Sequence, residues 1–274
     1  QPDNSFVGYA VEQGFTVFMI SWRNPQPTDT DGIDKATWAD YLQHGVLQAI
    51  DVVRDISGEE KINALGFCVG GTLLASALAV SRARGEDPIN SLSLLTTFLD
   101  FSETGILDIF VDDAHVAYRE LQLAQGGLMS ARELATTFSF LRPNELVWNY
   151  VVNNYLKGQS PPAFDLLYWN ADGTNLPGPF FAWYLRHTYL ENSLVQAGKV
   201  TVDGTPLDLG KLEMRLFVRV ARRSHCAVEV GLCQQQMVAE RSALCPWSIR
   251  AHRGSRQSAL PKKAFILDDR VAAQ

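Results

Sequence analysis

The sequence predicts an α/β fold, with a parallel β-sheet core, helices on its faces and an inserted, mainly helical subdomain. Two observations lead to this prediction. In the first hundred residues, short β-rich apolar runs alternate with longer segments of helical periodicity. After residue 102 this alternation stops, and helical stretches rich in aromatic residues continue to residue 198. A length of 274 residues fits one large core carrying such an insertion.

Three strands and two helices are expected in the first part of the core. Residues 15–21 are a β-rich apolar run, typical of a parallel strand covered on both faces. Residues 61–67 and 91–99 are two further candidate strands. Apolar residues recur at helical spacing within residues 38–56, and the Ser-Gly pair that follows predicts the end of this helix. Residues 71–84, rich in Ala and Leu, predict the second helix.

The expected organisation has four parts. Residues 1–102 form the first part of the core, and residues 103–198 form a cap. Residues 199–214 return to the core through a hairpin at an Asp-Gly turn. Residues 215–274 form a tail of different character.

Composition excludes several classes of protein. With 46% hydrophobic residues, the chain is not mainly disordered. Its apolar runs are too short to span a bilayer, and its first residues show neither the basic nor the apolar region of a signal peptide. It also begins without Met. We therefore expect a cytoplasmic protein of which this chain is a fragment.

The net charge of −6 conceals a reversal along the chain. Residues 1–214 hold 13 Lys and Arg against 26 Asp and Glu, whereas residues 215–274 hold 11 against 4. The tail also contains Cys226, Cys233 and Cys245, whose spacings match no zinc site. A basic tail is one way to bind nucleic acid, but this tail has no nucleic-acid-binding motif. We expect no nucleic-acid partner.

The candidate site is a strand, then a Gly-x-Cys-x-Gly pattern, then a helix. This is the nucleophile-elbow pattern with Cys68 in place of serine. Such a nucleophile sits on a strained turn crowded by its neighbours, so Gly66, Gly70 and Gly71 are expected around it. The helix N-terminus favours the thiolate, and the Val69 N–H would face a developing oxyanion. The plainer interpretation is a buried structural cysteine beside a tight turn.

The string Gly-Phe-Cys-Val-Gly-Gly at residues 66–71 resembles the catalytic box of class I polyhydroxyalkanoate (poly-3-hydroxybutyrate) synthases. Further strings that match this family occupy residues 17–25, 95–101, 138–144, 148–150 and 175–179. The resemblance extends from the first residues to about Met214. It implies an α/β-hydrolase core with a cap.

The resemblance also implies the activity and the partners. Members of this family are acyltransferases that polymerise (R)-3-hydroxyacyl-CoA, such as 3-hydroxybutyryl-CoA, and release CoA. Cys68 would form the acyl-enzyme, a histidine would act as base, and an aspartate would support that histidine. No metal or organic cofactor is required. The implied partners are the acyl-CoA substrate, the growing polyester chain and granule surface, and a second subunit in a homodimer.

The tail departs from the family. The family's aspartate lies in Gly-Ser-Arg-Glu-Asp-His-Ile-Val-Pro-Trp and its histidine in Gly-His-Ile-Ala-Gly, and neither string is present. Back-translated and read one base later, residues 218–230 can encode the first string and residues 248–257 the second. Residues 262–268 also give family-like sequence in that frame. We therefore hypothesise that the chain is out of frame from about Arg215, through a sequencing error or a real lesion.

This hypothesis has consequences for activity. The recorded chain keeps Cys68 but lacks the family's aspartate and histidine, so we expect it to be inactive and its tail to be poorly ordered. His225 and His252 lie near the expected places by count but outside their motifs. The second oxyanion donor is expected upstream of the first residue. The remaining histidines, His44, His115 and His187, are expected to be surface or packing residues.

Two alternatives stay open. The chain could be catalytically dead and retain only dimer or granule contacts, a role that the aromatic cap could serve. It could also be a cysteine thioesterase of the same fold, which would release free acid instead of polymer.

Overall fold

The computed structural model describes residues 5–141, 143–161, 172–219 and 264–268. They form two compact units, which are described separately. The sheet unit contains the described residues of 5–21, 42–100 and 194–268. The helical unit contains the described residues of 22–41 and 101–193. The domain boundaries expected from the sequence remain predictions.

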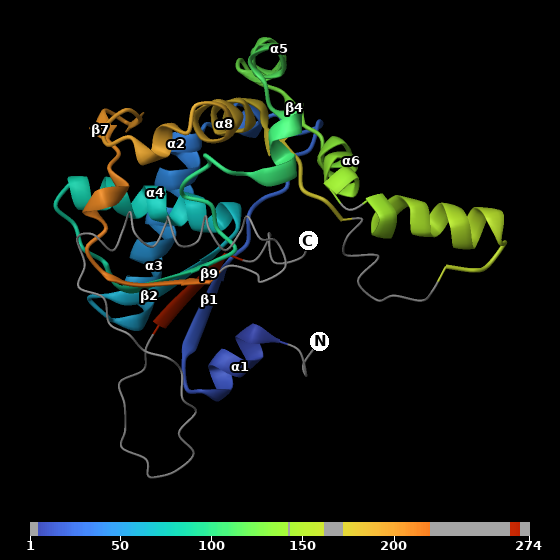
Figure 1. Ribbon diagram of the computed structural model, residues 1–274. Coiled ribbons are helices and arrows are strands. Elements are labelled where there is room, and N and C mark those ends of the chain that lie inside the picture. The colour runs from blue at the N-terminus through green and yellow to red at the C-terminus, as the bar shows by residue number, and fades with distance from the viewer. Residues whose placement is uncertain (1–4, 142, 162–171, 220–263, 269–274) are drawn as a thin grey trace. The chain divides into compact units, whose positions relative to one another are not determined.

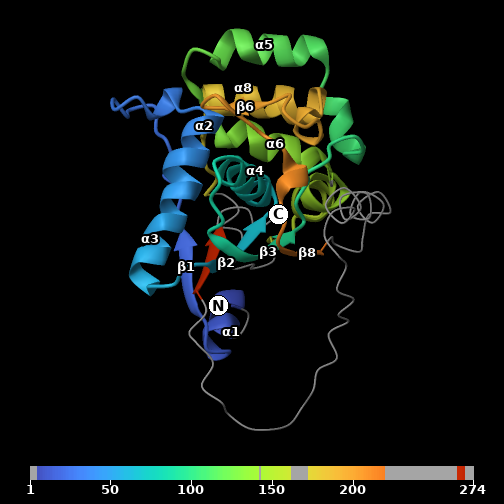
Figure 2. The ribbon, with the colours of Figure 1, turned by 90° about the vertical axis from the view of Figure 1, so that its left-hand side faces the viewer.

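The sheet unit contains a five-stranded sheet in the order β1-β9-β2-β3-β8 (Figures 1 and 2). All neighbouring strands pair in parallel, as the sequence predicts. The strands are β1 (Thr16–Ile20), β2 (Ile62–Phe67), β3 (Ile89–Leu95), β8 (Arg215–Arg219) and β9 (Ala264–Asp268).

The core of this unit lies around β2 and the helix that follows it. The first five residues of β2 are buried, because a central parallel strand is covered on both faces. The following helix, α4 (Val69–Ala83), is buried from Gly70 to Ser81. Alanines and glycines on α4 allow close packing, and a helix that is apolar all round is buried all round. In both views α4 lies along one face of the sheet and α1 (Phe6–Glu12) on the other.

Strand β1 corrects one expectation. The run at residues 15–21 does form a strand, but it is not covered on both faces, since Thr16 and Met19 are exposed. The reason is position: β1 stands at one end of the described sheet and has its pairing partner, β9, on one side.

The helix predicted at residues 38–56 forms as three consecutive segments: α2 (Trp38–Asp40), the π-helical η3 (Tyr41–Leu47) and α3 (Gln48–Ser57). Thr37 and Asp40 make a reciprocal capping box at its start. Gly58 ends it in the left-handed conformation, with φ of 70°. The π-helical stretch was not predicted, because hydrophobic periodicity does not reveal the wider turn.

The third strand is shorter than expected at its C-terminal end. It ends at Leu95 rather than at residue 99, because Thr96 takes a φ of 47° and turns the chain. The expected hairpin is confirmed: β6 (Thr201–Val202) pairs antiparallel with β7 (Thr205–Pro206). Asp203 and Gly204 have φ of 48° and 74°, the two positive values that a tight hairpin turn requires. Two short 3₁₀ segments, η8 (Ser193–Val195) and η9 (Leu209–Lys211), flank this hairpin.

Two segments of the tail form strands of this sheet. Arg215–Arg219 forms β8 beside β3, and Ala264–Asp268 forms β9 between β1 and β2. Both segments are short and apolar at their centres, so each can extend a parallel ladder. Residues 220–263 and 269–274 lie outside the described part of the chain.

The helical unit consists mainly of helices, as expected of a cap. Its α-helices besides α2 are α5 (Asp113–Leu123), α6 (Ala131–Leu141) and α8 (Gly178–Tyr184). The other helical segments are η2 (Ile33–Lys35), η4 (Gly105–Phe110), η5 (Asn144–Trp148), η6 (Val151–Leu156) and η7 (Leu185–Leu190). A small antiparallel pair, β4 (Leu128–Met129) with β5 (Leu176–Pro177), links two parts of this unit. Among the described residues, no helix combines the length and hydropathy of a membrane span.

Aromatic side chains form the interior of the helical unit. Trp38 is 1% exposed and stacks against three rings of α8. The ring centroids of Trp38 lie 5.3 Å from Phe180, 4.6 Å from Trp183 and 5.6 Å from Tyr184. A second cluster of buried side chains comprises Val116, Leu123, Met129, Phe181 and Leu185. These aromatic residues therefore pack the unit's core.

Asn175 joins three segments of the helical unit. Its backbone N–H donates to Asn24 Oδ1 at 3.0 Å, and its side-chain amide donates to the Pro25 carbonyl at 2.8 Å. Its Oδ1 accepts from the Ala131 N–H at 2.9 Å. Residues 17–25 and 175–179 both carry family strings, and these contacts bring the two together.

An ion pair fixes α5 against η7. The Arg186 guanidinium donates to both carboxylate oxygens of Glu120, with Nη2 at 2.5 Å from Oε2. This hydrogen bonding lowers the pKa of Glu120 and raises that of Arg186. Arg186 also contacts Glu191 at 3.3 Å.

Candidate functional site at Cys68

Cys68 lies at the junction between β2 and α4. Its backbone has φ of 50° and ψ of −126°, a conformation that is strained for any residue except glycine. Neighbouring bonds hold it there: the Cys68 N–H donates to the Leu95 carbonyl of β3 at 2.9 Å. The Cys68 carbonyl accepts from the N–H groups of Gly71 at 3.0 Å and Thr72 at 3.3 Å. Cys68 is thus both the last residue of the sheet edge and the N-cap of a helix.

The glycines around Cys68 allow close approach of strand and helix. A Cβ on Gly66 would lie 2.4 Å from the Gly71 Cα and 2.9 Å from its nitrogen. A Cβ on Gly71 would lie 2.0 Å from Thr97 Oγ1. Gly70 is buried in the first turn of α4. The crowding predicted for this turn is therefore found, and it is most severe between Gly66 and Gly71.

The helix after Cys68 is well placed to act on it electrostatically. Val69 is the first residue of α4, a helix of 15 residues. The first N–H groups of a helix have no carbonyl partner within it, and they carry the positive end of its dipole. Cys68 as a whole is only partly buried. A strained residue at a strand-to-helix turn, at the C-terminal end of a parallel strand, is the geometry expected of a nucleophile elbow.

Comparison with known proteins agrees with this geometry. A family model described as "alpha/beta hydrolase fold" matches residues 3–227. The chain belongs to the α/β-hydrolase fold family.

Within this family, the chain is similar to poly(3-hydroxyalkanoate) polymerases. It is 56% identical over 230 residues to the poly(3-hydroxyalkanoate) polymerase subunit PhaC of Cupriavidus necator, and the aligned region covers 82% of this chain and 38% of that protein. It is 41% identical over 226 residues to the corresponding subunit of Rhizobium meliloti, covering 82% and 36%. It is 42% identical over 226 residues to the poly(3-hydroxyalkanoate) polymerase of Methylorubrum extorquens, again covering 82% and 36%. The chain therefore spans less than two fifths of the length of these relatives.

The segment that follows β3, beside Cys68, contains residues whose role was not predicted from the sequence. Two residues after the end of β3, Thr97 donates its hydroxyl to the Leu95 carbonyl at 3.1 Å. The Thr72 hydroxyl on α4 donates to the Phe98 carbonyl at 2.7 Å. The first bond is local to the turn, and the second fixes the exit of β3 against the start of α4. The same turn contains Thr96 at φ of 47°, and no residue pattern in the sequence predicts a left-handed threonine there.

The histidine that the family resemblance implies as base is not placed among the described residues. His225 and His252 lie outside them. His44 is exposed on η3. His115 is in the first turn of α5, where its N–H is capped by Asp112 at 2.7 Å. His187 packs its ring 4.6 Å from Trp183, consistent with the expected packing role.

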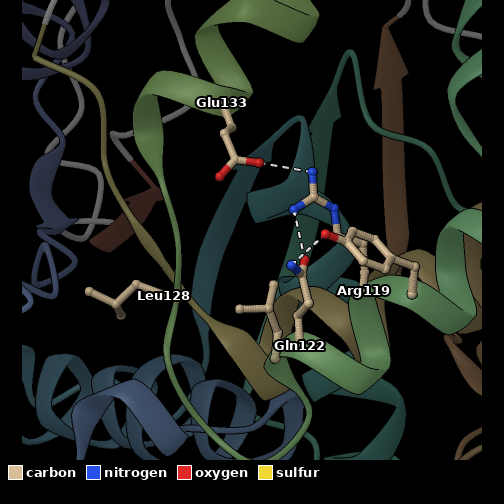
Figure 3. Close-up of a pocket in the computed structure, with 6 residues that line it drawn as sticks. Arg119, Gln122, Leu128 and Glu133 are labelled. Atoms are coloured by element: carbon tan, nitrogen blue, oxygen red, sulfur yellow. Dashed lines mark hydrogen bonds and ion pairs between the residues drawn. The ribbon is translucent and has the colours of Figure 1, made fainter.

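Two surface pockets of the described chain do not contain Cys68. The first lies in the helical unit (Figure 3). There Arg119 pairs with Glu133 at 2.8 Å and donates to Gln122 at 3.4 Å. Because Glu133 neutralises Arg119, these two lining residues supply no net positive charge that could bind the phosphate groups of the expected acyl-CoA substrate. The second pocket is lined mainly by carboxylates, which repel phosphate: Asp51, Arg54, Asp55, Gly58, Glu59 and Glu60.

Proposed function

We propose that this chain is the catalytic part of an acyltransferase that polymerises (R)-3-hydroxyacyl-CoA, such as 3-hydroxybutyryl-CoA, into polyester and releases CoA. Cys68 is the proposed nucleophile. The observation that carries this proposal is the strained backbone of Cys68, with φ of 50° at the N-terminus of α4, in a chain whose relatives are poly(3-hydroxyalkanoate) polymerases. Strain of this kind is concentrated at functional sites.

The proposed chemistry proceeds in two transfers. The Cys68 thiolate attacks the thioester carbonyl, and the tetrahedral intermediate collapses with loss of the CoA thiolate, which takes up a proton. The Val69 N–H is the proposed donor to the oxyanion of this intermediate. In the second transfer, the hydroxyl group of another hydroxyacyl unit attacks the acyl-Cys68 carbonyl, loses its proton to a base and frees the thiol. Each cycle forms one ester bond and consumes one thioester.

We further infer that the tail is recorded out of frame from about Arg215, and that the family's aspartate and histidine are lost for this reason. The charge reversal and the two shifted family strings support this inference. Without the base, we expect the recorded chain to form the acyl-enzyme slowly and not to turn over.

The test is acylation of the recorded chain. Purified protein is incubated with (R)-3-hydroxybutyryl-CoA, released CoA is measured with a thiol reagent, and peptide mass spectrometry locates the acyl group. We expect one equivalent of CoA and an adduct on Cys68, with neither in Cys68→Ala. Release of free acid in many turnovers would support the thioesterase alternative, and a folded chain without any adduct would support the non-catalytic one.

A second test separates the two readings of the tail. The coding DNA is resequenced on both strands across the codons for Leu212 to Ser224. If resequencing shows that the recorded sequence lost or gained a base there, the corrected frame encodes the family's aspartate and histidine. The corrected protein should then form polymer. An unchanged frame means a real lesion, and the protein should then be inert in polymerisation.

A further inference from the structure

Thr96 combines two unfavourable features at one position. It lies directly after β3 with φ of 47°, in the left-handed region that a β-branched residue rarely adopts. Its hydroxyl oxygen is also buried, and it has no hydrogen-bond partner among the described residues. A buried hydroxyl that has exchanged water for no partner is destabilising. Either feature alone would call for an explanation.

Thr96 is adjacent to Cys68 in the sheet. Strands β2 and β3 pair in register up to Phe67 and Leu95, and the Cys68 N–H continues the ladder to the Leu95 carbonyl. Cys68 and Thr96 are therefore the first residues beyond the paired strands, and both have positive φ. In open α/β sheets, this C-terminal edge is where ligands bind.

The turn itself does not require a threonine. The turn at position 96 is needed because it brings the Thr97 side chain against Gly71 and the Phe98 carbonyl within hydrogen-bond distance of the Thr72 hydroxyl. Glycine or asparagine at position 96 would make the same left-handed turn with less strain. Because Thr97 next to it does bond its hydroxyl, to Leu95, an unpaired hydroxyl is not imposed by this segment. What Thr96 supplies in excess of a glycine is a buried hydroxyl and a methyl group.

We propose that Thr96 is a substrate-contacting residue, whose hydroxyl hydrogen-bonds the 3-hydroxyl oxygen of the acyl group held by Cys68. This inference rests on the proposed function. The thioester carbonyl is served by backbone N–H groups at the start of α4. A 3-hydroxyacyl group has one other oxygen, and Thr96 lies at the end of the neighbouring strand β3 rather than at the helix. A threonine hydroxyl both donates and accepts, which matches a ligand hydroxyl.

The test is the preference of Cys68 between two thioesters. Single-turnover acylation by (R)-3-hydroxybutyryl-CoA and by butyryl-CoA is followed by intact-protein mass spectrometry. Because both rates come from the same protein, the ratio is independent of a missing base. We expect the original chain to favour the hydroxyacyl substrate about five- to tenfold, the effect of one neutral hydrogen bond. Thr96→Val, which keeps the shape, should bring this ratio to about one, and Thr96→Ser should retain most of it.

A matched control exists in the same unit. Ser76 on α4 also has a buried hydroxyl without a partner among the described residues, and it lies two turns beyond Cys68. Ser76→Ala should leave the ratio unchanged. The thermal midpoint of Thr96→Val should be equal to or above that of the original chain, because an unpaired polar group is removed. This readout separates loss of recognition from loss of folding.

Each remaining outcome counts against the inference. An unchanged ratio in Thr96→Val, with Cys68 acylated, overturns the role of Thr96 and leaves the proposed function intact. Equal acylation rates with both substrates in the original chain also overturn the role of Thr96 and leave the proposed function intact. If neither thioester acylates Cys68, the proposed function fails, and the role of Thr96 fails with it.

Discussion

A methyl group added to Gly66 would lie 2.4 Å from the Cα of Gly71, so the strand and the helix that flank Cys68 meet without space for a side chain. Both atoms in this contact belong to the backbone or are fixed to it, and neither can rotate away. The strained turn at Cys68 is possible only because of this approach.

We therefore predict that Gly66→Ala destabilises the sheet unit by about 3 kcal/mol or more, as overpacking against backbone does at its most severe. Gly71→Ala should also destabilise, but its nearest neighbour is the Thr97 hydroxyl, which a second substitution can remove. Thr97→Ala should recover part of the loss in Gly71→Ala and none of it in Gly66→Ala. Denaturant unfolding measures all four variants, and equal stability of Gly66→Ala and the original chain would contradict the geometry.

Asn175 gives a second prediction. Asn175→Ala removes its bonds to the Pro25 carbonyl and from the Ala131 N–H, so we expect a loss of about 1–3 kcal/mol. Asn175→Asp keeps the acceptor for Ala131 but cannot donate to Pro25. Its stability should lie between those of the original chain and of Asn175→Ala. The control is Asn153→Ala, whose amide bonds to Asn149 on the surface. If Asn175→Ala costs no more than this control in thermal unfolding, the three-way contact does not stabilise the unit.

The Glu120–Arg186 pair predicts a pH dependence. The guanidinium lowers the pKa of Glu120 below its usual value of 4.5, so the folded state binds this proton less tightly than the unfolded state. The pair's contribution is complete above about pH 4.5 and is lost as pH falls through the lowered pKa. Glu120→Gln should cost about 1–2 kcal/mol at neutral pH and reduce the loss of stability between about pH 5 and pH 3.

The control for this prediction is Glu12→Gln, which changes an exposed carboxylate on α1. It should leave both the stability and its slope with pH unchanged. A Glu120→Gln variant with the same acid sensitivity as the original chain would refute the coupling.

The tail gives a fourth prediction. Strand β9 lies between β1 and β2, and within the described sheet β1 pairs with β9. Truncation after Met214 removes β8 and β9 together, so the backbone N–H groups of β1 (Thr16–Ile20) that bond to β9 lose their partners. Hydrogen exchange of these amides should accelerate by at least tenfold, while the amides shared by β2 and β3 change less. Unaltered protection of β1 after truncation would show that β9 does not hold it.

The sequence predicted most of what surrounds Cys68, and the reason is local. The strand, the glycines and the helix are adjacent in the chain, so their pattern records their spatial relationship directly. The same is true of the Asp203-Gly204 turn, where two residues alone determine the backbone.

What the sequence did not predict depends on residues far apart. The stacking of Trp38 on α8 joins positions about 140 residues apart, and nothing near Trp38 indicates it. The exposure of β1 and the position of β9 depend on which strands complete the sheet. The strain at Thr96 is set by contacts of its neighbours with α4, because threonine has no preference of its own for the left-handed region.

The position of β9 also has a consequence for the time course of folding. Strands β1 and β2 are close in the chain, yet the segment that bridges them lies some 200 residues beyond β2. At about 5–20 residues per second, synthesis leaves β1 without that bridge for about 10–40 s. During this interval the apolar edges of both strands are open to other nascent chains. Yield of soluble protein should therefore depend on the rate of translation and on chaperones that cover strand edges.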